Sequence, residues 1–216
     1  MNRLARIYHK NQPLNEPVWH IQIALFSIIV LQLLQDKDFV FGPKYIISAF
    51  ELLLLVLLII ITQTNAKMLV KRSIATTFVV LITASNIISL GLVTYSLFDS
   101  TGVQGHTLLL SAVVIFITNI IIFGIWYWEI DYNKYYRPVN LIFPQTNAPE
   151  HAGLHDKGWY PTFFDYLYVS ITNATAFSPT DSLPLTHKMK ALMAVQSLVS
   201  LAVVVLVTAK AVSIIG

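Results

Sequence analysis

The stretch PTFFDYLYVSITNATAFSPTDSLPLT, residues 161–186, decides how this chain folds. Its beginning, Phe163 to Ile171, is apolar and aromatic, whereas residues 172–178 are mostly small and hydroxylated. Pro161 suits the first position of a helix, and Pro179 disfavours helical backbone at the residue before it. A helix with these limits has about 13 to 17 residues and is about 20 to 25 Å long, which is short for a full membrane crossing. The stretch predicts a short helix followed by a polar segment.

On both sides of this stretch the sequence contains long apolar runs. Hydrophobic residues make up 56% of the 216 residues and charged residues 12%, against about 25% charged residues in a typical soluble domain. This composition excludes a water-soluble enzyme and predicts an all-α membrane protein with one membrane domain, residues 1–216. Three N-terminal helices are expected within residues 1–97. Five transmembrane helices of about 20 residues are predicted, at residues 17–34, 45–62, 74–97, 108–128 and 188–215.

A short helix, a polar stretch and a long helix follow one another in the order of a re-entrant pore loop. Non-helical backbone is tolerated at membrane depth only where protein buries it or where it lines water. We therefore expect five transmembrane helices plus one re-entrant segment. The alternative is that residues 162–178 cross fully and form a sixth span.

Residues 175–186, TAFSPTDSLPLT, resemble the filter region of the potassium channels, T-T-V-G-Y-G-D-x-x-P-x-T. The matching residues are Thr175, Asp181, Pro184 and Thr186. The resemblance covers about residues 108–215 and implies an outer helix, a pore helix and an inner helix. It also implies a homo-oligomer, a tetramer in that family. The filter-like residues are then Thr172, Asn173, Thr175, Phe177, Ser178, Pro179, Thr180 and Asp181.

The chain departs from the potassium-channel pattern in the filter itself. That filter is a ring of backbone carbonyls from four subunits, and its glycines allow backbone angles that other residues adopt only at a cost. Ser178 and Thr180 stand at the glycine positions here, with Pro179 between them. Potassium selectivity is therefore not expected.

Three other stretches carry a second resemblance. They are WYWE at 126–129, FPQ at 143–145 and DYLY at 165–168. With them, the chain is similar to a group of uncharacterised prokaryotic membrane proteins whose C-terminal half resembles the pore domain. This resemblance implies a bacterial or archaeal inner membrane and no established activity.

Polar residues inside the predicted spans are further candidates. Gln196, Ser200 and Thr208 in the last span either line an aqueous cavity or form hydrogen bonds within their own or a neighbouring helix. Glu51 lies near the middle of the second span, where a carboxylate costs several kcal/mol unless it is protonated, paired or hydrated. Glu51 is thus either a functional group or a neutral acid hydrogen-bonded to Asn86 or Asn119.

Aromatic residues close the fourth span. The cluster Trp126, Tyr127 and Trp128 is typical of an interfacial belt, in which the rings lie at the depth of the lipid headgroups.

Other chemistries find little support in the sequence. The chain has no cysteine and no hydrolase, metalloprotease, P-loop or dinucleotide-binding motif, so no enzyme, cofactor or metal site is expected. His151 and His155 lie in a polar loop without a metal-site motif. The net charge of +3 comes from lysine and arginine spread over short loops, which orients helices against a membrane and does not indicate nucleic acid.

The basic residues predict the orientation. Five spans place the N-terminus, residues 67–72 and residues 129–190 on the same side of the membrane. These three segments contain eleven of the fourteen lysine and arginine residues. The positive-inside rule places that side in the cytoplasm. The re-entrant segment would then enter from the cytoplasm, opposite to its direction in potassium channels.

Three functions remain open from the sequence. The first is an oligomeric channel-like protein that passes inorganic ions without potassium selectivity. The second is a proton-linked transporter centred on Glu51, and the third is a non-conducting membrane subunit that uses the pore-domain fold for packing.

Overall fold

The computed structural model describes residues 19–40, 43–64, 68–98, 105–132, 140–147, 161–178 and 182–215. Apart from one short strand pair, the regular elements are helices. The helices are α2 (Trp19–Leu34), α3 (Lys44–Gln63), α4 (Met68–Phe98), α5 (Gly105–Tyr132), α6 (Pro144–Asn147), α7 (Phe163–Thr175) and α8 (His187–Ile215), with the 3-10 turn η1 (Lys37–Phe39) after α2. The strands are β1 (Leu141–Ile142) and β2 (Leu183–Pro184).

Four of these helices, α3, α4, α5 and α8, are long and apolar enough to cross a membrane. The apolar helix α2 has 16 residues, or about 24 Å. The expected all-α fold is confirmed, and its helices indicate a multi-pass membrane protein. The helix expected at 74–97 begins earlier, at Met68, and therefore includes Lys71. The Lys71 Nζ donates to the carbonyl oxygens of Thr62 and Thr64, which stabilises the C-terminal end of α3.

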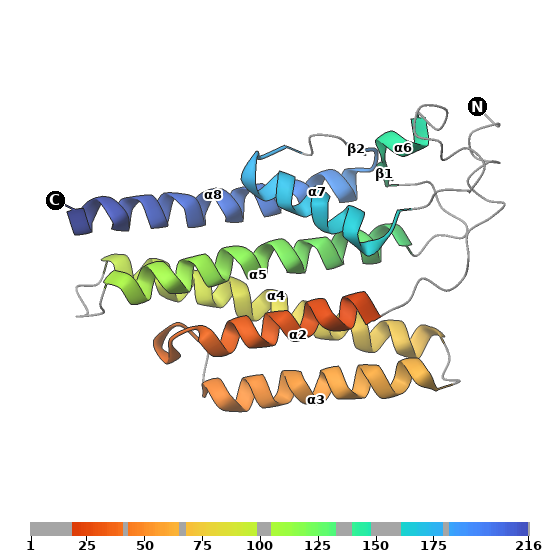
Figure 1. Ribbon diagram of the computed structural model, residues 1–216, viewed down its shortest axis with the longest axis horizontal. Coiled ribbons are helices and arrows are strands. Elements are labelled where there is room, and N and C mark those ends of the chain that lie inside the picture. The colour runs from red at the N-terminus through yellow and green to blue at the C-terminus, as the bar shows by residue number, and fades with distance from the viewer. Residues whose placement is uncertain are drawn as a thin grey trace.

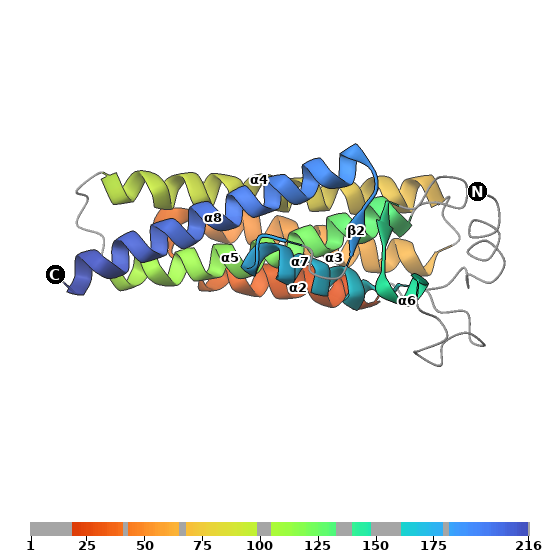
Figure 2. The ribbon, with the colours of Figure 1, turned by 90° about the horizontal axis from the view of Figure 1, so that it is seen from above.

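The long helices lie side by side and alternate in direction (Figures 1 and 2). The beginning of α2 and the end of α8 are at opposite ends of the bundle. The central helix is α5, which packs against α2, α4, α7 and α8. Its buried residues include Ile115, Ile122 and Tyr127. The element that carries the candidate site, α7, therefore rests on the middle of the bundle.

The short helix α7 runs only part of the length of its neighbours (Figure 1). It starts at the end of the bundle where α5 finishes, and the chain comes back to the same end before α8 begins. There β1 pairs with β2 in antiparallel register, with Leu141 opposite Pro184 and Ile142 opposite Leu183. The segment between these strands thus leaves from and returns to one end of the bundle.

A close approach of two backbones seats α7 on α5. A Cβ atom added at Gly124 of α5 would lie 3.2 Å from the Cα of Leu167 in α7. A methyl group at this position would require the facing backbone to move by a few tenths of an ångström.

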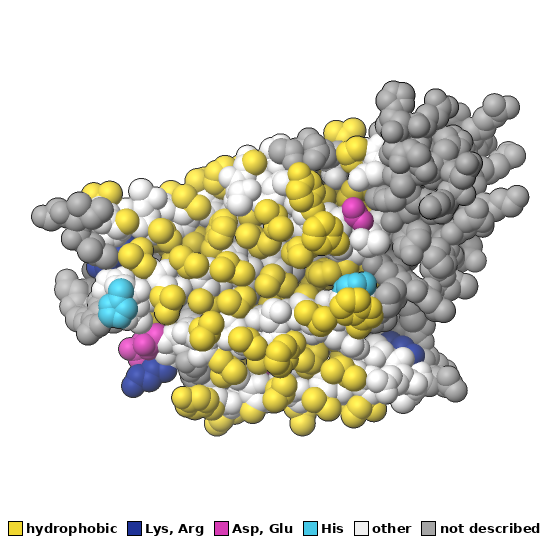
Figure 3. Space-filling view, in the orientation of Figure 1, with side chains coloured by type: hydrophobic (Ala, Val, Ile, Leu, Met, Phe, Trp, Pro, Cys, Tyr) yellow, Lys and Arg dark blue, Asp and Glu magenta, His cyan; other side chains and the backbone are white. Residues whose placement is uncertain are grey.

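Large apolar side chains cover much of the outer surface (Figure 3). On α3 they include Phe50 and Leu53, and on α8 they include Leu198 and Val205. Exposed apolar surface of this extent marks contact with lipid or with another protein.

Candidate functional site

Side-chain hydrogen bonds fix the beginning of α7. The Asp165 carboxylate accepts from the backbone N–H of Thr162 at 2.7 Å and from its hydroxyl at 2.9 Å. Thr162 is thus the N-cap, and Pro161 precedes the helix instead of taking its first position. An acidic residue in the first turn also complements the helix dipole.

A second set of hydrogen bonds holds both ends of the 141–184 segment to the end of α5. Asp131 accepts from the Asn140 backbone N–H at 2.8 Å and from the Tyr166 hydroxyl at 2.9 Å. Asn140 donates its side-chain amide to the Ile130 carbonyl and accepts from the Thr186 hydroxyl at 2.9 Å. Thr186, one of the residues that match the potassium-channel motif, therefore anchors the start of α8 to the chain ahead of α7.

A buried polar cluster joins α5, α7 and α8 at the centre of this region. We call Tyr127, Ser170, Asn173 and Gln196 the amide cluster. Gln196 donates to the hydroxyl of Ser170 at 2.6 Å and to its carbonyl at 3.0 Å. Its side-chain oxygen accepts from the Tyr127 hydroxyl and, at 2.9 Å, from the Asn173 amide. The Ser170 hydroxyl in turn donates to the Ile120 carbonyl of α5 at 2.6 Å. Each of the four residues is at most 1% exposed, so their polar groups need hydrogen-bond partners within the protein.

Further bonds extend from the amide cluster along the helices. The Asn173 amide also donates to the Met193 carbonyl at 3.0 Å, and the Ser197 hydroxyl donates to the Asn173 oxygen. One turn further along α8, Asn119 donates to the Ser200 hydroxyl at 3.1 Å. The bonds of Asn173 join α7 to α8, and the bond of Asn119 joins α5 to α8. Hydrogen bonds of this kind contribute to the association of membrane helices.

The polar residues predicted for the inner helix are placed as follows. Gln196 and Ser200 are fully buried and bond to neighbouring helices. Thr208 is exposed and donates to the Val204 carbonyl of its own helix. These residues were expected either to line an aqueous cavity or to form hydrogen bonds with their own or a neighbouring helix. In the single chain all three form such hydrogen bonds.

The end of α7 is exposed, unlike its middle. Thr175 and Thr172 donate to carbonyls one turn back in their own helix, and Thr175, Phe177 and Ser178 lie at the surface. Phe177 has a φ of 53°, which lies in the left-handed region. Helices often end with a residue in this region, and that residue is usually glycine. Pro179, Thr180 and Asp181 lie outside the described residues.

The partner expected for Glu51 was wrong. Glu51 is 3% exposed and faces Gln32 of α2, not Asn86 or Asn119. With the Gln32 amide oriented so that its nitrogen meets the carboxyl group, Gln32 donates to both oxygens, at 3.2 Å to Oε1. Asn86 and Asn119 belong to α4 and α5 and line a pocket together with residues of α8. The carboxyl group of Glu51 thus lies between α2 and α3.

The structure also shows what the sequence pattern did not reveal. Tyr127 was expected in an interfacial belt, yet it is completely buried and bonded to Gln196. Asn140 and Ser170 were not singled out, because each is a lone polar residue without a motif. The only signal for Ser170 was its position three residues before Asn173, which places the two near one face of a helix.

No metal or cofactor ligand set stands out in the part of the chain that the structure describes. Within those ranges no three histidine, aspartate or glutamate side chains come together to hold an ion. His151 and His155 lie outside the described residues.

Compared with protein-family models, with curated proteins and with solved structures, the chain finds no match.

Proposed function

We propose that this protein is the subunit of an oligomeric, channel-like pore in the cell inner membrane, with residues 161–186 as a re-entrant segment. The observation that carries the proposal is the path of the chain around α7. This helix starts at one end of the bundle and packs against α5 and α8, and β2, which follows it, lies at that same end (Figure 1). In this arrangement α5, α7 and α8 correspond to an outer helix, a pore helix and an inner helix. Five spans then place the ends of the chain on opposite sides.

The exposed end of α7 supports this role. Thr175 and Ser178 present hydroxyl groups at the surface of the single chain, where a re-entrant segment would need water or neighbouring subunits. The exposed apolar face of α8, with Leu198 and Leu201, supplies surface for subunit packing. A homo-oligomer, a tetramer by the potassium-channel resemblance, would bring these ends together around a central opening.

The orientation follows from the positive-inside rule. Lys71 near the start of α4 and Lys190 near the start of α8 lie at the end of the bundle where α7 begins. Lys37 in η1 lies at the other end. We propose that the re-entrant segment enters from the cytoplasm and passes inorganic ions without potassium selectivity, because no glycine stands in residues 175–186.

Ion flux from liposomes tests the proposal. We expect leak of sodium and potassium above that of empty vesicles, and at least a severalfold change in Thr175→Val and Asp181→Asn, since each removes a polar group from the residues that resemble a channel filter. Thr94→Val is the matched control, because Thr94 in α4 also donates only to the carbonyl of its own helix. Leak equal to that of empty vesicles, or a monomer in lipid nanodiscs, would contradict the pore and favour a non-conducting subunit.

A second candidate function is a proton-linked transporter centred on Glu51. It is favoured by the burial of this carboxyl group in a helix that can cross a membrane, with Gln32 as its partner among the described residues. Here we expect uptake that depends on the pH gradient and is abolished in Glu51→Gln. Asp38→Asn, which removes an exposed carboxylate of η1, should leave uptake unchanged. Unaltered uptake in Glu51→Gln would exclude this mechanism.

A further inference from the structure

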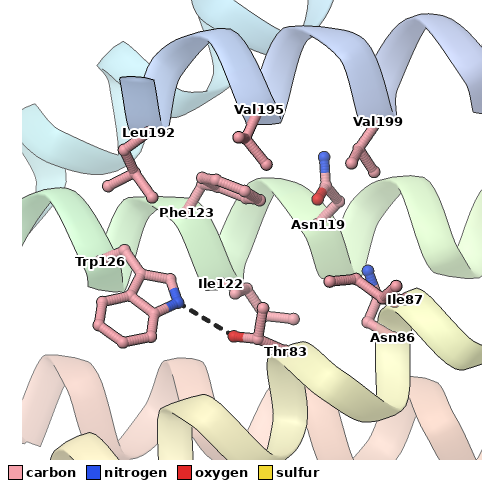
Figure 4. Close-up of a pocket in the computed structure, with 10 residues that line it drawn as sticks. All are labelled: Thr83, Asn86, Ile87, Asn119, Ile122, Phe123, Trp126, Leu192, Val195 and Val199. Atoms are coloured by element: carbon pink, nitrogen blue, oxygen red, sulfur yellow. Dashed lines mark hydrogen bonds between the residues drawn. The ribbon is translucent and has the colours of Figure 1, made fainter. Parts of the chain in front are cut away.

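A pocket lies between α4, α5 and α8 (Figure 4). Its volume is about 200 Å³, and apolar side chains such as Ile122, Phe123 and Leu192 form most of its wall. Polar groups stand at its two ends. Thr83 and Trp126 lie toward one end, and Asn86 and Asn119 lie at the other.

The polar groups at the first end are satisfied within the protein. The Trp126 indole N–H donates to the Thr83 hydroxyl at 3.0 Å, and that hydroxyl donates to the Val79 carbonyl at 2.6 Å. This end of the pocket therefore offers no free hydrogen-bond donor from these two residues.

The other end has unused hydrogen-bonding capacity. The Asn86 side chain is 5% exposed and forms no hydrogen bond with any residue in the described ranges. Asn119 uses its nitrogen for Ser200, while its oxygen accepts from no described residue. A mostly buried amide without a partner lacks the hydrogen bonds that water would supply, so a ligand that bonds to these groups gains affinity from them.

The mouth of the pocket opens on the apolar outer surface. Ile87 of α4 and Val195 of α8 border it, and each is about half exposed. A molecule would enter from the bilayer, between these two helices. None of the described residues that line the pocket is a lysine, arginine, aspartate or glutamate, so its occupant should carry no charge.

The size of the pocket limits the part of the ligand that enters. An engineered cavity of about 150 Å³ in another protein holds benzene, so about 200 Å³ accommodates one ring with a small polar substituent. We propose that this pocket binds a neutral amphiphile dissolved in the membrane, whose hydroxyl-bearing ring hydrogen-bonds to Asn86 and Asn119. This inference does not depend on the proposed pore.

Photolabelling in lipid nanodiscs tests the site with a matched pair of probes. One probe is a trifluoromethyl phenyldiazirine carrying a hydroxymethyl group, and the other is the same compound without that group. We expect the hydroxylated probe to label residues 192–199 more strongly than the lipid-facing residues of α3. Excess benzyl alcohol should compete for this labelling but not for that of α3.

The decisive variant is Asn86→Leu, which removes the unpartnered amide without breaking a hydrogen bond. Labelling of 192–199 by the hydroxylated probe should fall about fivefold, the effect of losing one net hydrogen bond, while labelling of α3 stays constant. Labelling by the probe without a hydroxyl should not change. A second variant, Val195→Phe, narrows the mouth from an exposed position and should reduce labelling by both probes. Equal labelling of the wild type and Asn86→Leu, or equal labelling of the pocket by the two probes, would overturn the proposal.

Discussion

Replacing Gln196 with leucine is expected to lower the free energy of unfolding by about 3 kcal/mol. The change removes the four hydrogen bonds that Gln196 makes to Tyr127, Ser170 and Asn173. Bonds between membrane helices average about 0.6 kcal/mol each, and the buried Tyr127 hydroxyl loses its acceptor, which adds about 1 kcal/mol. Unfolding by SDS in mixed micelles, followed by tryptophan fluorescence, measures the difference.

Gln22→Leu is the matched control for this prediction. Gln22 makes one side-chain bond, to Thr62 at 3.2 Å, from a half-buried position between α2 and α3, and its loss should cost about 0.6 kcal/mol. Tyr127→Phe combined with Gln196→Leu should cost less than the two single changes together, because the phenylalanine leaves no hydroxyl without an acceptor. The amide cluster would not hold α7 in place if Gln196→Leu were as mild as Gln22→Leu.

Gly124→Ala is expected to destabilise the protein by about 1 to 2 kcal/mol, the cost of a modest overpacking. The new methyl group would meet the backbone of Leu167 at 3.2 Å and push α7 away from α5. Gly91→Ala provides the control, since a Cβ at Gly91 in α4 has no neighbour within 4 Å. There the gain in helix propensity should stabilise the protein by up to about 1 kcal/mol.

The same SDS titration compares the two glycine variants. The two substitutions should change the free energy of unfolding in opposite directions. Alanine favours the helix at both positions, but only the methyl group at position 124 meets the backbone of another helix. A stabilising Gly124→Ala would mean that α7 does not lie against α5 at this distance.

Much of the secondary structure could be predicted from local sequence patterns. The apolar runs placed each long helix within a few residues of its observed limits, except for the earlier start of α4. The proline residues and the change of composition at Thr172 located α7, which runs from Phe163 to Thr175. Local signals suffice here because hydrocarbon requires long apolar helices and because proline acts on its immediate neighbours.

The partners of the polar residues could not be predicted in this way. Tyr127 and Gln196 are 69 residues apart, and they meet only because α5 and α8 turn particular faces toward each other. The α5 and α8 sequences are apolar on all sides, so no periodicity marks the inward face. For the same reason Asn86 and Asn119 were the partners considered for a hydrogen-bonded Glu51, whereas the residue that it meets is Gln32.

By itself the sequence determined that the chain forms long apolar helices with one short, partly polar helix before the last. Tertiary structure alone decided that Gln196 and Asn173 are buried and hydrogen-bonded to each other, and that Asn86 faces a pocket. The physical reason is that helix formation depends on neighbours along the chain, whereas the meeting of two side chains depends on how each helix is rotated about its axis and on how closely the helices approach.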